Sequence, residues 1–411
     1  MTPMTILGVD ERVNSLCKAH KPSQFRLEDV VRPNILALQP YYTERDEYEA
    51  ALLLDANENS YGPMITEKSE VTDAMQMHRY PAPDLMGTRQ AATKLRNMPD
   101  PAFTFLGVGS DEVIDLMLRC FARPGKDKIL ICPPTYSMYK ISAMVNDVEV
   151  VAVPLILDGK SFALDVPKVL ETMQNDPLIK MVILCSPGNP TGSLLARESI
   201  SAVLNCPNYR GLVVVDEAYI DFPLEEQAMK LRYVDQPVSA VDLVPEYANL
   251  IVSQTLSKSF GLAGVRLGLA FAQPATVQIM NNTKAPYSIS APSAYYASQA
   301  LSPEGIKKMH NCVRTMIQNR TEMIEALQSI PNIGRVLGTN DANFVLVEIL
   351  KDGRPSNERA CYIHRVLAQE HGLMVRNRCH ELGCEGCIRI SVGKPEENQR
   401  CTQAIRQLLQ S

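Results

Sequence analysis

Short, largely apolar runs that alternate with helical patterns between residues 104 and 271 constrain the fold of this chain most. Five of these runs have the length and the β-branched composition of strands: 128–132, 148–153, 181–185, 212–215 and 250–253. A strand that is apolar at successive positions has both faces covered, whereas burial of one face gives alternation. The runs therefore predict an α/β fold with a mostly parallel sheet between helices, in which ligands bind at the carboxyl ends of the strands.

The pattern changes after residue 303, which indicates a second, smaller domain. A long helical pattern runs toward residue 329, and strand-like runs follow at 344–347 and 388–392 before a final helix. We predict a small α+β domain from these elements. We assign 1–25 to a flexible N-terminal extension, 26–60 to the N-terminal part of the small domain, 61–300 to the large domain and 301–411 to the rest of the small domain.

Charge and cysteine content limit the partners and the compartment. The net charge of −5 favours neither nucleic acid nor an anionic membrane as a partner. We find no run of about 18 apolar residues that would span a membrane. The 11 cysteines are an odd number, and the first residues lack both a basic segment and a sustained apolar run. We therefore expect reduced thiols and a cytoplasmic location.

Lys258 is the residue with the most suggestive surroundings. It lies between Ser257 and Ser259, and Arg266 follows eight positions after it. A lysine amine can form an imine with an aldehyde, and an arginine can bind an anion nearby. Most lysines lie in solvent at the surface, but the hydroxyl and glycine neighbours of Lys258 favour a pocket.

Two upstream clusters supply the other groups that pyridoxal phosphate (PLP) requires. The cofactor needs an amine, a carboxylate at its pyridine nitrogen, hydrogen-bond partners for its O3′ oxygen and a cradle for its phosphate. Asp216 ends an apolar run and can supply the carboxylate, although a helix N-cap is an equal alternative for it. Tyr219 and Asn189 can reach O3′, the latter from a turn rich in proline and glycine.

A helix start supplies a candidate phosphate cradle. Ser110, Asp111 and Glu112 precede a helical pattern over 113–121, where free backbone N–H groups would face an anion. An ordinary capped helix is the alternative. Ser257 and Arg266 can complete the cradle. Tyr136 can stack on the cofactor ring, but a packed loop tyrosine fits the same segment.

Arginines and cysteines near the C-terminus have less specific patterns. Arg376 and Arg389 form a cationic clamp for an anionic substrate if both face the pocket, whereas Arg389 faces solvent in the alternative strand orientation. Cys384 and Cys387, with Cys379 and His380 before them, lack the second ligand pair of a typical zinc site. We interpret this segment as a structural loop and predict no metal site.

With these residues in place, the chain resembles the fold-type I PLP enzymes of the aspartate aminotransferase superfamily. Within that superfamily it is similar to the histidinol-phosphate aminotransferase family. The resemblance covers the chain from about residue 32 to the C-terminus. It rests on the segments 38–41, 54–59, 79–81, 132–136 and 255–266 and on the pair Arg376 and Arg389. The first 25 residues and the loop at 379–387 have no counterpart in the family.

The resemblance implies a seven-stranded sheet in the large domain and a role for each site residue. Lys258, Asp216 and Tyr219 would be catalytic. Tyr80 would reach the cofactor phosphate of the opposite subunit, so a homodimer with shared sites is implied. The cofactor would also contact Ser110, Asp111, Glu112, Tyr136, Asn189, Ser257 and Arg266. The substrate would contact Tyr41, Asn57, Arg376 and Arg389.

The implied reaction transfers the amino group between glutamate and imidazole acetol phosphate by a ping-pong mechanism, as a step of L-histidine biosynthesis. The motifs around the cofactor are shared with threonine-phosphate decarboxylase and with aromatic amino acid aminotransferases, so these remain alternatives. A PLP-sensing regulator is a non-enzyme alternative. It would need a DNA-binding module, for which the short N-terminal segment leaves no room.

Overall fold

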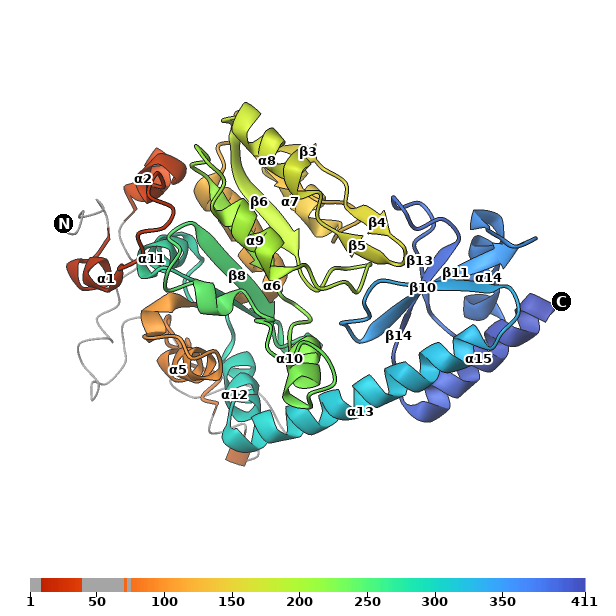
Figure 1. Ribbon diagram of the computed structural model, residues 1–411. Helices are drawn as coiled ribbons and strands as arrows, with labels where there is room; N and C mark the ends of the chain where they lie inside the picture. The colour runs from red at the N-terminus through yellow and green to blue at the C-terminus, as the bar shows by residue number, and fades with distance from the viewer. Residues whose placement is uncertain (1–8, 39–69, 72–74, 411) are drawn as a thin grey trace.

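The computed structural model describes residues 9–38, 70–71 and 75–410 of the chain (Figure 1). Its centre is a seven-stranded sheet in the order β1-β9-β8-β7-β6-β2-β3. β9 pairs antiparallel with β1 and β8, and the remaining pairs are parallel. The strands are β1 (Thr104–Val108), β2 (Lys128–Ile131), β3 (Glu149–Ala152), β6 (Ile179–Cys185), β7 (Leu212–Asp216), β8 (Leu250–Thr255) and β9 (Leu267–Ala272). The predicted α/β class is confirmed, and the five predicted strands end within two residues of the observed bounds.

Both faces of this sheet are buried, as the apolar runs require. Val213 and Val215 of β7 point into one core, and Val214 between them points into the other. Helices cover the two cores (Figure 1). They are α5 (Met86–Leu95), α6 (Gly109–Phe121), α7 (Met138–Val145), α8 (Val166–Asn175), α9 (Arg197–Leu204), α10 (Asp221–Ala228), α11 (Pro274–Thr283) and α12 (Ala291–Ala300). Short 3-10 turns lie at η2 (Pro101–Phe103), η3 (Val241–Leu243) and η4 (Ala263–Val265).

A second sheet near the C-terminus has its own core. It is antiparallel, with the order β10-β11-β14-β13 and β12 paired to β11. Figure 1 shows the long helix α13 running from the helices of the large sheet toward this second sheet. The elements are α13 (Pro303–Gln328), β10 (Ile333–Leu337), β11 (Phe344–Lys351), β12 (Arg354–Pro355), α14 (Asn357–Gln369), β13 (Arg376–Asn377), β14 (Cys387–Ser391) and α15 (Pro395–Gln410).

Several connections hold the second sheet beside the first, and two of them bury large side chains. The hairpin of β4 (Ile156–Asp158) and β5 (Ser161–Ala163) buries Phe162 against Leu337 and Leu346 of the second sheet. On α13, the buried Arg320 pairs with Glu226 of α10 and donates to the carbonyl of Ala342 at 2.9 Å. Buried charges of this kind are stable only when paired, so the two sheets meet in a defined orientation.

The N-terminal residues pack differently from the prediction. Helices α1 (Glu11–Leu16), α2 (Leu27–Val30) and α3 (Pro33–Leu36) lie beside α11, and Phe25 and Ile35 are buried in a core of the large sheet. Val9 and Phe25 thus have a surface to bury, and the flexibility of the extension stays a prediction. Residues 26–38 likewise join the large sheet and not the small one. Residues 39–60 lie outside the described residues, and the domain boundaries stay a prediction.

The start of α6 is packed tightly against β9, and this contact generates a stability prediction. A Cβ added to Gly268 would lie 2.5 Å from the backbone nitrogen of Ser110, and neither backbone can move freely. We expect Gly268→Ala to lower the free energy of unfolding by about 1–3 kcal/mol in urea denaturation. The control is Gly87→Ala on α5, where nothing lies within 4 Å and a gain of up to about 1 kcal/mol is expected. Equal effects of the two substitutions would contradict the close packing.

Candidate active site

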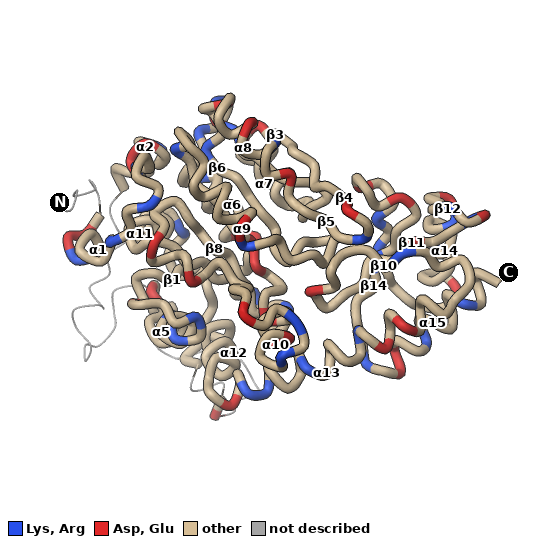
Figure 2. Tube along the Cα trace, in the orientation of Figure 1, with Lys and Arg blue, Asp and Glu red and all other residues tan. Residues whose placement is uncertain are grey.

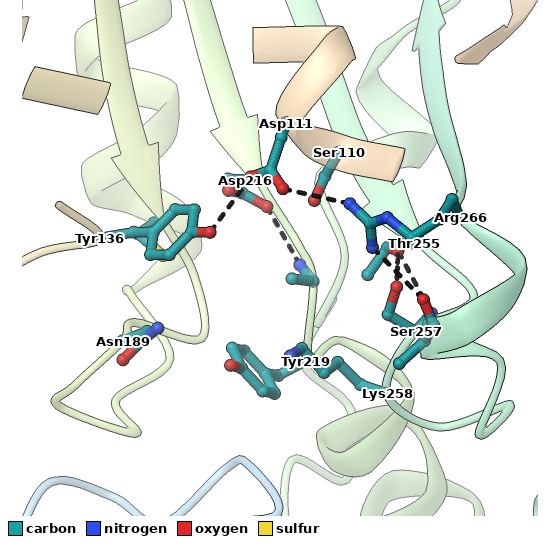
Figure 3. Close-up of a pocket in the computed structure, with 13 residues that line it drawn as sticks. Ser110, Asp111, Tyr136, Asn189, Asp216, Tyr219, Thr255, Ser257, Lys258 and Arg266 are labelled. Carbon is teal, nitrogen blue, oxygen red and sulfur yellow. Dashed lines mark hydrogen bonds and ion pairs between the residues drawn. The ribbon is translucent and has the colours of Figure 1, made fainter. Parts of the chain in front are cut away.

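A cavity opens at the carboxyl ends of the parallel strands, at the edge of the sheet that faces the second sheet (Figure 3). The strands β1, β6, β7 and β8 all end there, and β9 starts there because it is antiparallel. The sheet therefore brings together residues that are up to 156 positions apart in the sequence, from Ser110 to Arg266. The cavity is lined by Ser110, Asp111, Tyr136, Cys185, Asn189, Asp216, Ala218, Tyr219, Thr255, Ser257, Lys258, Ala263 and Arg266.

Asp216, the last residue of β7, is the buried carboxylate of this cavity. Only 3% of its surface is exposed. Its Oδ2 accepts a hydrogen bond from the Tyr139 hydroxyl at 2.5 Å, and its Oδ1 accepts one from the Ala218 backbone N–H at 3.2 Å. Burial raises the pKa of Asp216 to about 6, and the bond from Tyr139 opposes that rise. A cation beside Asp216 would offset the cost of its charge.

Lys258 follows β8 and enters the cavity from the opposite side. Its Nζ lies 5.6 Å from the centre of the Tyr219 ring. Burial lowers the pKa of Lys258, and the positive charge of Arg389 lowers it further. Both effects increase the fraction of neutral amine, the form that acts as a nucleophile or accepts a proton.

The loop that carries Lys258 is anchored on both sides. Ser259 donates a hydrogen bond to Asp221 at 2.5 Å, and Arg96 binds the same carboxylate at 2.6 Å. The backbone N–H of Gly261 donates to the Lys258 carbonyl at 3.0 Å, closing a turn in which Gly261 has a φ of 65°. These contacts fix the position from which the amine extends.

Basic and hydroxyl groups gather at one end of the cavity, around the start of α6 (Figure 3). Arg266 lies 3.1 Å from the Asp111 carboxylate, and Thr255 donates to the Ser257 hydroxyl at 2.9 Å. A Cβ on Gly109 would come within 2.9 Å of the Arg266 guanidinium carbon, so only glycine leaves room for that side chain. Free N–H groups at a helix start, an arginine and a serine form a suitable cradle for a phosphate group.

Aromatic and amide groups occupy the rest of the wall. Tyr136 donates a hydrogen bond to Asp111 at 3.1 Å, and burial raises the pKa of Tyr136 to about 12. The Tyr219 ring meets Phe344 of β11 edge-on, with 5.3 Å between the ring centres. Asn189 accepts a hydrogen bond from Arg389. The second sheet therefore contributes directly to the site.

The two predicted substrate arginines lie side by side on the second sheet. Arg376 of β13 is directly opposite Arg389 of β14 in the register, so both side chains leave the same face. Arg389 lies over the Phe344 ring at 5.0 Å, and its buried Nε has no partner among the described residues. A buried donor without a partner is costly, which makes this position suitable for an anionic ligand. Arg376 is more exposed.

Two of the predicted cofactor-binding residues do not line the cavity, and two predicted substrate residues cannot be placed. Glu112 does not line the cavity, because its carboxylate accepts the Val108 backbone N–H at 2.5 Å and caps the start of α6. Tyr80 lies away from the cavity of its own chain, 52% exposed and stacked on Tyr287 at 4.8 Å. Tyr41 and Asn57 lie outside the described residues.

Sequence reasoning missed several residues of the site. Tyr139 of α7 is fully buried and binds Asp216, and nothing in the local sequence indicates that contact. Cys185 and Thr255 end their strands and line the cavity. Arg378, two residues after Arg376, adds positive charge near Arg389 and has a buried Nε without a partner in the described part of the chain.

Comparison with known proteins agrees with this geometry. A family model, aminotransferase class I and II, matches residues 49–405. The chain belongs to the class I and II aminotransferases. This aminotransferase is 44% identical to histidinol-phosphate aminotransferase from Schizosaccharomyces pombe (strain 972), over 94% of this chain and 98% of that protein. It is 41% identical to the Saccharomyces cerevisiae protein of the same name, with the same coverage of each chain.

Solved structures share the fold of this aminotransferase. Histidinol-phosphate aminotransferase from Sinorhizobium meliloti, in complex with pyridoxal-5'-phosphate, has a TM-score of 0.70 at 21% identity, over 86% of this chain and 90% of that one. L-threonine-O-3-phosphate decarboxylase from Porphyromonas gingivalis has a TM-score of 0.62 at 19% identity, over 83% and 94%. Since an aminotransferase and a decarboxylase both match, the fold by itself does not define the reaction.

The burial of Asp216 predicts a pH-dependent stability of the cofactor-free aminotransferase. The pKa of Asp216 is raised from 3.8 to about 6 in the folded protein. Ionisation of Asp216 therefore lowers the free energy of unfolding as the pH rises through this range, and the loss is complete above pH 6. We expect Asp216→Asn to stabilise the cofactor-free protein more at pH 8 than at pH 5, by on the order of 1 kcal/mol in denaturant unfolding. The control is Asp158→Asn at an exposed position. A gain that does not change with pH would exclude a buried charge.

Proposed function

We propose that this aminotransferase is a histidinol-phosphate aminotransferase, which transfers the amino group between glutamate and imidazole acetol phosphate in L-histidine biosynthesis. The observation that carries the proposal is the 44% identity to a relative of that name over 98% of its length. The cavity at the strand ends and the arginines of the second sheet support the same reaction, because they provide groups for a phosphorylated cofactor and for an anionic substrate.

The residues of the cavity fit PLP as the cofactor. Ser257, Arg266 and the N–H groups at the start of α6 would hold its phosphate, with the Arg266 guanidinium placed against Gly109. Asp216 would bind the pyridine nitrogen, which gives this buried carboxylate the cation it lacks. Asn189 and Tyr219 would bind the O3′ oxygen, Tyr136 would stack on the ring, and Lys258 would hold the aldehyde carbon.

PLP, when bound, supplies an electron sink that stabilises negative charge at the α-carbon of the substrate. The residues of the chain supply the rest. Asp216 would keep the ring nitrogen protonated, because a buried carboxylate stabilises a proton on its partner. Lys258, with its lowered pKa, would accept the proton from the α-carbon of the substrate and donate it again as general acid. Asp111 and Tyr139 hold Tyr136 and Asp216 in place by hydrogen bonds.

The substrates of both half-reactions are anionic, and the arginines match them. Arg389 would bind the carboxylate of glutamate and, in the other half-reaction, the phosphate of the histidinol substrate. Arg376 lies opposite it and would add a second cation. We include Tyr41 and Asn57 in the substrate site on the resemblance to the family.

We propose a homodimer with shared active sites. Tyr80 is half exposed and does not line the cavity of its own chain, which supports contact with the cofactor phosphate of a partner subunit.

We propose neither nucleic acid nor a membrane as a partner. The net charge is −5, and basic and acidic residues are interspersed along the trace in Figure 2. Of the described helices, none has the length and apolar composition that crossing a membrane requires. A cytoplasmic location is supported by the free cysteines.

Substitution of Lys258 tests the assignment of the cofactor lysine. We expect Lys258→Ala to lose nearly all turnover and the visible absorbance of the lysine-bound cofactor, because no other amine lines the cavity among the residues that the structure describes. Borohydride reduction followed by peptide mass spectrometry should label position 258 in the unsubstituted enzyme. Lys284→Ala is a suitable control, since Lys284 is also buried but does not line the cavity. Labelling at another lysine would overturn the assignment.

The reaction itself is tested with purified enzyme, glutamate and imidazole acetol phosphate. We expect stoichiometric formation of 2-oxoglutarate and histidinol phosphate, with the parallel-line kinetics of a ping-pong mechanism. Threonine phosphate serves as the competing substrate, and release of CO₂ from it would favour the decarboxylase. Turnover only with an aromatic oxo acid would keep the cofactor site but replace the proposed substrate.

A further inference from the structure

Three side chains of types that can bind metal ions meet beside β13, the strand that carries Arg376. None of them lines the cavity described above. Among the residues that the structure describes, Cys361, Cys379 and His380 are the one group of three such side chains whose ligand atoms all lie within 4.8 Å of one another. Cys361 comes from α14, whereas Cys379 and His380 begin the loop after β13. The cluster therefore joins two separate segments, and the spacing of ligands along the sequence does not indicate it.

The separation of the two sulfur atoms is informative about the ligand. The Sγ atoms of Cys361 and Cys379 lie 3.6 Å apart. Two thiolates bound to one tetrahedral zinc ion, each at about 2.3 Å, lie about 3.8 Å apart, and a thiolate and an imidazole on the same ion lie about 3.6 Å apart. A disulfide would instead need about 2.05 Å between the sulfur atoms. The two sulfur atoms therefore have the spacing of a metal-bound pair, and the imidazole nitrogen, which lies within 4.8 Å of them, would move closer on binding.

A single side-chain amide contacts both cysteines. Asn377 donates a hydrogen bond from its amide nitrogen to the Cys361 sulfur at 3.0 Å, and its side-chain oxygen accepts the Cys379 backbone N–H at 2.9 Å. One amide therefore orients both cysteines, as an outer-shell residue does in metal sites. Cys379 is only 3% exposed, and Cys361 is half-buried.

The cysteine pair on which the sequence analysis concentrated has a different environment. Cys384 and Cys387 are fully buried and pack with Phe162 and Leu346, away from any imidazole of the cluster. The second cysteine that Cys379 and His380 require comes from α14, 18 positions earlier in the chain than Cys379. We expected no metal site because the segment lacks the second ligand pair of a typical zinc site, and the fold brings one further cysteine, Cys361, to Cys379 and His380.

We propose that Cys361, Cys379 and His380 form a zinc site with water as the fourth ligand. The exposed position of His380 leaves the ion open to solvent on one side. Binding converts two thiols to thiolates and releases their two protons, and the neutral imidazole adds no charge, so the complex of Zn²⁺ with two thiolates is neutral. The ion ties α14 to the segment that carries Arg376 and Arg378. This inference does not depend on the proposed reaction.

Titration of the holoenzyme with zinc chloride tests the site. The protein is first treated with a chelator and kept in a phosphine reductant, and zinc binding is followed by competition with a chromophoric chelator. We expect one tight equivalent per chain and a rise in the thermal unfolding midpoint. Cobalt(II) should give the visible absorption of a tetrahedral site in a difference spectrum, at wavelengths beyond the cofactor band.

Single substitutions assign the ligands. Cys361→Ser and His380→Gln should each weaken zinc binding by more than tenfold, and Asn377→Ala by about 10–100-fold. Cys312→Ser, which removes an exposed thiol of α13, should bind zinc unchanged. Retention of the cofactor absorbance and of the far-ultraviolet dichroism shows that each variant is folded. His380 is exposed, so its substitution leaves the fold intact and keeps the test decisive.

Three results would overturn the proposal. The first is the absence of a tight equivalent in the reduced holoenzyme. The second is zinc binding that survives both Cys361→Ser and His380→Gln, which would place the ion elsewhere. The third is a Cys361–Cys379 disulfide that forms in air and cannot be prevented by zinc, measured as the loss of two thiols, because it would assign the pair to redox chemistry.

Discussion

A buried carboxylate at the end of a central strand is the constraint on which the rest of the site depends. Asp216 is 3% exposed, and two hydrogen bonds do not remove the cost of its charge. A protein keeps such a group when a ligand supplies the missing cation, and in the proposed function a protonated pyridine nitrogen would do so. The free-energy cost of the buried charge in the cofactor-free protein would then favour cofactor binding and protonation of the ring nitrogen. Tyr139 moderates that cost without abolishing it, because a neutral donor stabilises the carboxylate less than a cation would.

The second sheet completes the chemistry by bringing cations to a cavity built by the first. Arg389 reaches Asn189 across the gap between the sheets, and its charge also lowers the pKa of Lys258. The residue that would bind substrate thereby favours the neutral amine that the reaction needs. This coupling works only if the sheets keep their relative positions. The hairpin of β4 and β5 and the pair of Arg320 with Glu226 hold them there.

Asp216 and Glu217 illustrate how far sequence patterns reach. Both are fully buried acids at one strand end, and composition cannot distinguish them. Successive side chains point to opposite sides, so Asp216 enters the cavity while Glu217 accepts bonds from Ser239, Ala240 and Gln254 on the other side. Strand alternation shows that the two acids face opposite sides. Which of them faces the ligand is known only when the orientation of the sheet is known. Glu112 was predicted to contact the cofactor, but its carboxylate accepts the Val108 backbone N–H and caps the start of α6 instead.

The sequence by itself determined the buried parallel strands, the order of the clusters along them and the lysine, because these depend on local periodicity and on residue chemistry at strand ends. It could not determine which distant side chains meet. The contact of Tyr139 with Asp216, the packing of residues 9–38 on the large sheet and the approach of Cys361 to Cys379 arise from tertiary packing. Such contacts depend on the orientation of whole helices and strands, which is fixed by burial summed over many residues and not by any one segment.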